Sequence, residues 1–96
     1  MKSFFLFLLL IPILAIGQIN ITGVTKSKTE NIYFSHINFK HSDGTSYSTI
    51  SNEKSEYKVK IKPGLYNVTA SYMGYSKFSK EINITSDVIL DIIFEE

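Results

Sequence analysis

Two histidines and three tyrosines are the residues whose types and spacing could serve a chemical site in this chain. His36 and His41 are five positions apart, so within one strand they would point to opposite faces. Otherwise a strand and its turn would divide them, and no third ligand is spaced to join them, so we predict no metal site. Tyr47, Tyr72 and Tyr75 could stack on sugar rings, and they are the candidate ligand-binding residues.

The residue types that usually carry catalysis are scarce. The chain contains no cysteine, which excludes disulfides and thiolate chemistry. It also lacks arginine, whose planar fork grips phosphates and carboxylates. Its serines stand outside any Gly-x-Ser-x-Gly elbow, and its acidic residues form no pair spaced for acid–base work. We therefore predict that the protein is not an enzyme and holds no cofactor.

The first 17 residues, "MKSFFLFLLLIPILAIG", differ from the rest of the chain. One basic residue, Lys2, precedes an apolar run from 4 to 16, and small residues stand before a plausible cleavage point. The run is shorter than the roughly 20 residues that span a bilayer. The pattern predicts a signal peptide at 1–17, whose removal leaves one domain at 18–96 with no transmembrane segment. The alternative is an uncleaved anchor.

The charge of the chain excludes one class of partner. The formal net charge is +1, and loss of Lys2 with the leader brings it to about zero. Binding to nucleic acid requires a strongly basic face, so we predict no nucleic-acid partner.

Beyond the leader, apolar and polar residues alternate with a period of two, and turn residues such as Asp43-Gly44 separate the runs. In the stretch "KPGLYNVTASYMGY", residues 62–75, parity leaves Tyr75 alone outside the core. The inward set of this stretch is Tyr66, Val68, Ala70 and Tyr72. Short strands at this spacing predict an all-β fold, a seven-stranded antiparallel β-sandwich.

The Pro63-Gly64 pair admits two paths for the chain. A two-residue hairpin would place Ile61 opposite Tyr66 and Val59 opposite Val68, all on one face. Pro-Gly at the two central positions favours a type II turn, however, whereas tight hairpins prefer the primed turns. Either such a turn splays the two strands, or the chain crosses between the two sheets at this point.

The stretch "SEYKVKIKPGLYNVTASYMGYSKFSKEINI" resembles the carboxypeptidase regulatory-like domain, a transthyretin-like (prealbumin-like) β-sandwich. The resemblance rests on the strand led by Tyr57, the turn at 63–66 and the Gly74-Tyr75 pair, with similar opening ("INITGVT") and closing ("VILDIIF") strands. It covers nearly all of 18–96 and departs from the family at "NEKSE", where Asp-Gly is common. It implies an Ig-like Greek key without catalytic residues. Such domains usually precede something larger, such as a peptidase, a surface protein or a TonB-dependent outer-membrane receptor.

Four apolar side chains occupy the second face of two predicted strands, where a sandwich should be polar. They are Ile32, Phe34, Ile89 and Ile93. Either a loop or a terminus covers them, or they form an exposed patch that docks a partner or a second copy.

These features together predict an exported, non-catalytic β-sandwich with a structural or protein-interaction role in the bacterial cell envelope. Its expected location is the periplasm, the outer membrane or the exterior, and its expected partner is an envelope or outer-membrane protein, or a glycan. The alternatives are a carbohydrate-binding module and a remnant of the N-terminal domain of a TonB-dependent receptor.

Overall fold

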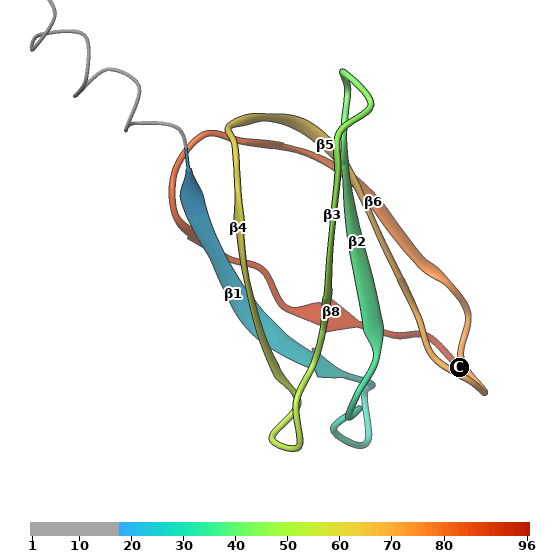
Figure 1. Ribbon diagram of the computed structural model, residues 1–96. Coiled ribbons are helices and arrows are strands. Elements are labelled where there is room, and N and C mark those ends of the chain that lie inside the picture. Colours follow the sequence, from blue (N-terminus) through green and yellow to red (C-terminus); the bar gives the residue numbers. More distant parts are fainter. Residues whose placement is uncertain (1–17) are drawn as a thin grey trace, which may run out of the picture.

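A computed structural model describes residues 18–96, and the predicted leader at 1–17 lies outside the described residues. The described part is a β-sandwich of two sheets (Figure 1), which confirms the predicted fold class. Within it there is no helix of the length and apolarity needed to cross a membrane. The strands are β1 (Ile19–Lys26), β2 (His36–His41), β3 (Ser46–Ile50), β4 (Glu56–Ile61), β5 (Gly64–Ser71), β6 (Phe78–Ile84), β7 (Val88–Ile89) and β8 (Ile92–Ile93).

The first sheet has the order β4-β1-β7, and β8 also pairs with β1. β4 is antiparallel to β1, with Val59 opposite Ile21. β7 and β8 run parallel to β1, with Val88 beside Ile21 and Ile92 beside Thr25. The second sheet, β3-β2-β5-β6, is antiparallel throughout.

The last predicted strand is therefore two short strands, and its parallel pairing differs from the expected antiparallel sandwich. The interruption lies beside Gly23, where an added Cβ would stand 2.1 Å from the Leu90 carbonyl oxygen. The Leu90 N–H donates to the Thr22 carbonyl at 2.8 Å, and its carbonyl accepts from the Tyr57 hydroxyl. The closing segment thus approaches β1 so closely at this point that only glycine fits.

The two predicted paths at Pro63-Gly64 are resolved in favour of the crossing. β4 pairs within the first sheet and β5 within the second, so the hairpin register that paired Ile61 with Tyr66 is wrong. Gly64 has a φ of 148°, and a Cβ there would lie 2.1 Å from Nε2 of His41. The turn therefore carries the chain across the sandwich, and the imidazole occupies the space that any larger residue at position 64 would need.

Alternating side chains from both sheets fill the core, as the period of two predicted. Phe39, between Tyr47 and Val68 in the second sheet, is fully buried. The core also contains Ile21, Ile32, Ile37, Tyr57, Ile61, Tyr66, Ala70, Ile84, Leu90, Ile92 and Phe94.

Candidate functional site

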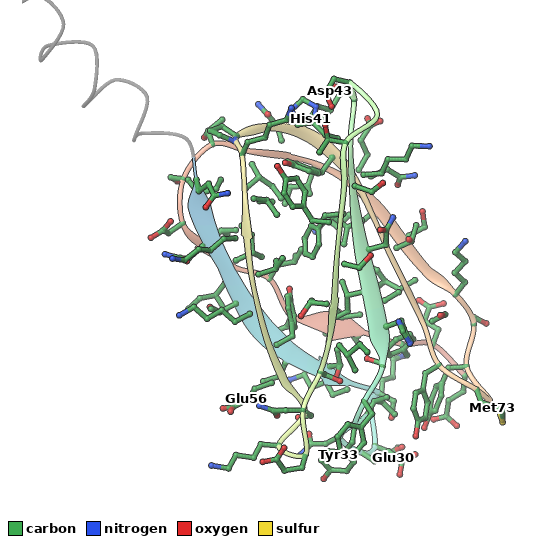
Figure 2. All side chains as sticks on the ribbon, in the orientation of Figure 1. Glu30, Tyr33, His41, Asp43, Glu56 and Met73 are labelled. Atoms are coloured by element: carbon green, nitrogen blue, oxygen red, sulfur yellow. The ribbon has the colours of Figure 1, made fainter. Side chains whose placement is uncertain are left out.

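The two ends of the sandwich differ in the side chains that they expose. The connections at 27–35, 51–55 and 72–77 form one end, which we call the apolar end. The opposite end, which we call the polar end, is formed by the connections at 42–45, 62–63 and 85–87. Figure 2 shows Glu30, Tyr33 and Met73 at the first and His41 and Asp43 at the second. The exposed large apolar side chains at or beside the apolar end are Tyr33, Phe34, Ile50, Tyr72, Met73 and Ile93.

The structure does not bring the four residues of the predicted patch together. Ile32 is only 3% exposed and belongs to the core, so its place in the patch was wrong. The reason is local, because the Ile32 N–H donates to the Thr25 carbonyl at 2.9 Å and the Thr25 hydroxyl donates back to the Ile32 carbonyl at 2.5 Å. Phe34 is 61% exposed, but it lies in the β1–β2 connection with a φ of 57° rather than on a sheet face.

Ile89 and Ile93 do stand on the outer face of the first sheet, 75% and 47% exposed. A cleft of about 530 Å³ adjoins Ile89, with Thr22 and Lys58 among its lining residues and Ile50 of β3 contributing as well. A second cleft, of about 590 Å³, shares Thr22, Lys58 and Ile89 with the first. Ile89 is thus an apolar side chain that projects between two hollows; we call this region the outer-face surface.

Two aspartates of the closing segment have structural roles that the sequence did not reveal. Oδ1 of Asp87 accepts a hydrogen bond from the Asn20 N–H at 2.8 Å, and Oδ1 of Asp91 accepts one from the Val24 N–H at 3.1 Å. Each carboxylate accepts a hydrogen bond that a backbone carbonyl would accept in a continuous strand, at a position where neither β7 nor β8 pairs with β1. Their shared separation of 67 residues from their partners is the register of β7 and β8, which no local pattern signals.

The structure brings together two of the three candidate stacking tyrosines. The rings of Tyr72 and Tyr75 lie 6.1 Å apart, centroid to centroid, whereas Tyr47 packs near Tyr66 at 6.3 Å. The prediction that Tyr72 faces the core was wrong, because Tyr72 is exposed; Tyr75, predicted to lie outside the core, is half-buried and packs against it. β5 ends at Ser71, so the strand parity no longer applies to Tyr72.

Tyr75 is held from two sides. Its ring packs against Phe94 at 6.0 Å, and its hydroxyl donates to Oε2 of Glu30. This bond is the largest cause that raises the pKa of Tyr75, because ionisation would place a phenolate beside a carboxylate. Glu30 is 45 residues away in sequence, and no spacing pattern could have identified it.

At the polar end, His41 joins the two neighbouring turns. Its Nδ1 accepts from the Asp43 N–H at 3.0 Å, so its Nε2 carries the proton and donates to the Pro63 carbonyl at 3.1 Å. Asp43 also binds the Lys62 ammonium, and this hydrogen bond above all holds the pKa of Asp43 well below its usual range. His36 is exposed at the other end of β2, so the two histidines cannot share an ion.

No family model matches the sequence, and no curated protein matches it closely. Chlorocatechol 1,2-dioxygenase from Pseudomonas putida superposes with a TM-score of 0.71 and 10% identity, over 83% of this chain and 61% of that one. The Bacillus anthracis TIE protein superposes with a TM-score of 0.64 and 14% identity, over 82% of this chain and 17% of that one.

At these identities the similarity shows the fold alone, a β-sandwich. The chain spans less than two thirds of either structure. The more specific resemblance to the carboxypeptidase regulatory-like domain stays a prediction from the sequence.

Proposed function

We propose that the leader at 1–17 exports this chain and that the sandwich acts as a non-catalytic module that docks a protein of the bacterial envelope. The observation that carries the proposal is the outward orientation of Ile89 and Ile93 on the first sheet, 75% and 47% exposed. The outer face of a sandwich strand is normally polar. Apolar side chains that stand on it beside hollows are typical of docking surfaces.

The polar groups around Ile89 suit a protein partner. Lys58 and Glu56 of β4 and Asp91 of the closing segment line the same cleft, so charges of both signs surround the apolar centre. An apolar centre within a polar rim is the usual anatomy of a protein interface.

The positions of the other polar residues support a non-catalytic role. His41 is engaged by backbone groups of two turns, and Asp87 and Asp91 each accept a backbone N–H of β1. These three side chains are thus used to hold the fold. Export is supported by the leader pattern, and the envelope by the resemblance of residues 55–84 to regulatory-like domains.

Photocrosslinking tests the proposal. A photo-reactive amino acid at position 89 of the full chain, expressed in bacterial cells, should trap one envelope protein. The same amino acid at Leu65, a 43% exposed residue of the other sheet, should not. An excess of chain carrying I89T and I93T should fail to compete for the trapped protein, while the L65T variant should compete as the unchanged chain does.

Two outcomes contradict the proposal. If positions 89 and 65 trap the same proteins equally, the outer-face surface has no specific partner. If I89T/I93T unfolds the domain in urea at concentrations where L65T stays folded, the two isoleucines are core residues and the surface is misassigned.

A further inference from the structure

The turn between β5 and β6 is exposed and yet firmly held. It comprises 72–75, closed by a hydrogen bond from the Tyr75 N–H to the Tyr72 carbonyl at 3.2 Å. Gly74, with a φ of 91°, occupies the third position, as in a type II turn. The Ser76 N–H also donates to the Glu95 carbonyl at 2.8 Å, which ties the turn to the end of the chain. These two backbone hydrogen bonds hold the turn in this conformation.

The two rings of this turn and the ring of Phe94 form a series from the surface to the core. Phe94 is 1% exposed, Tyr75 packs against it with ring centroids 6.0 Å apart, and Tyr72 lies 6.1 Å beyond Tyr75. The Tyr72 and Tyr75 planes are inclined at 45°, so the pair forms an open angle rather than a closed stack. Tyr72 is 39% exposed, and an apolar partner can therefore reach its ring.

A polar group stands beside these rings. Glu30 is exposed and accepts the Tyr75 hydroxyl through Oε2, so a ligand hydroxyl can reach its other carboxylate oxygen. Met73, at the tip of the turn, is 92% exposed and adds an apolar edge (Figure 2). An aromatic surface next to a fixed hydrogen-bond acceptor fits a molecule with one apolar face and a polar rim.

We propose that Tyr72, Tyr75 and Glu30 form a binding site for a neutral sugar ring, such as a hexose or an N-acetylhexosamine within a glycan. The C–H face of the ring would pack on Tyr72, and one hydroxyl would donate to Glu30. Because Phe94 and Glu30 already hold Tyr75, binding adds little ordering cost at that side chain.

The charge of the site selects against acidic sugars. The Glu30 carboxylate and, to a smaller extent, that of Glu96 raise the pKa of Tyr75, and Glu95 lies on the segment bonded to Ser76. A uronic acid would bring another carboxylate among these groups and be repelled. The site is separate from the outer-face surface, since none of its three residues lines the clefts beside Ile89.

Titration of the full chain with defined oligosaccharides tests the site. Cellohexaose and chitohexaose serve as neutral probes and an oligogalacturonate as the acidic one. Isothermal titration calorimetry measures binding, because tyrosine fluorescence would come from all six tyrosines of the chain and would change with each tyrosine variant itself. At least one neutral probe should give a saturable change, and Y72A should weaken its binding by roughly tenfold. Y75F and E30A should weaken it less, because each removes only the polar part of the site.

Tyr33→Ala is the matched control, since Tyr33 is 41% exposed at the same end; it shares the 27–35 connection with Glu30 but lies outside the turn that carries the Tyr72 and Tyr75 rings. It should bind the neutral probe as the unchanged chain does, and I89T/I93T should do so too. The proposal is overturned if neither neutral probe gives a saturable change, if Y72A and Y33A weaken binding equally, or if the acidic probe binds as tightly. A photo-reactive residue at Met73 that traps a protein while no probe binds would assign the turn to protein docking instead.

Discussion

The polar and apolar ends of this sandwich close the same two sheets by different means. At the polar end, His41 donates to the Pro63 carbonyl and Tyr66 donates to the Lys62 carbonyl at 2.6 Å, so side chains satisfy the backbone of the turns. At the apolar end, the hydrogen-bonded side chains are buried beneath the surface of the connections. Ser35 and Ser51 are buried and bonded to each other, and rings stand exposed above.

The difference follows from what each end has to connect. At the polar end, the chain crosses from the first sheet to the second through two residues, 62 and 63. The turn must therefore be tight, and side chains must supply hydrogen bonds to its backbone groups. At the apolar end, longer connections pack their own hydroxyls beneath the surface. Their outward side chains are then available for binding, and the proposed sugar site uses residues of this end, whereas Ile89 of the outer-face surface lies in β7, directly after the 85–87 connection.

The largest expected effect compares two glycines, one at each end. Gly64→Ala should lower the free energy of unfolding by roughly 2–4 kcal/mol, because its Cβ would lie 2.1 Å from His41 at a φ of 148°. Gly74→Ala should cost only about 1–2 kcal/mol, because its φ of 91° is strained but nothing lies within 4 Å. Urea unfolding of both variants measures the difference.

Removal of the obstructing ring provides the control for that comparison. In the double variant H41A/G64A, the Cβ has room and part of the loss should be recovered relative to the sum of the two single changes. Equal losses from Gly64→Ala and Gly74→Ala would mean that the polar end is no more tightly closed than the apolar one.

The next effect concerns alkaline pH. Burial raises the pKa of Tyr66 to about 12 from an unfolded value near 10, so the stability that its neutral form contributes is complete below about pH 10 and is lost as the pH rises to about 12. Burial also raises the pKa of Tyr57, in the same direction. Urea midpoints measured across this range should fall less in Y66F than in the unchanged chain.

Added salt should change the pKa of a tyrosine at the apolar end more than that of a tyrosine at the polar end. The pKa of Tyr75 is raised by an exposed carboxylate, so added salt should weaken that shift, whereas the burial that governs Tyr66 is screened little. The difference in tyrosinate absorbance between the unchanged chain and Y66F, and between the unchanged chain and Y75F, at low and high salt measures each of them. A salt response at Tyr66 as large as that at Tyr75 would contradict the burial of its hydroxyl.

The smallest effect compares two hydroxyls. Tyr66→Phe should cost about 1 kcal/mol, because it leaves the Lys62 carbonyl without its donor on a residue whose ring is fully buried. Tyr75→Phe should cost less, since water can replace a hydroxyl bonded to an exposed carboxylate. Thermal unfolding of the two variants measures this. A larger loss from Tyr75→Phe would show that the apolar end also depends on side-chain closure.

The sequence predicted side-chain orientation well inside strands and poorly beyond them. Parity placed Tyr66, Val68 and Ala70 in the core, where the structure has them. It failed at Tyr72 because β5 ends one residue earlier, and at Ile32 because that residue lies in a connection that Thr25 folds inward. Where a strand ends depends on its partner, and no alternation in the chain itself records that.

By itself, the sequence determined the class of the fold and the face on which most strand residues lie, because the period of two is a local property of an extended backbone. Only the tertiary structure decided which strands pair. In the structure, β5 and β4 belong to different sheets, β7 and β8 run parallel to β1, and Glu30 accepts a hydrogen bond from Tyr75. Pairing depends on long-range packing and on close approaches such as that of Leu90 to Gly23, which alternation along one chain cannot encode.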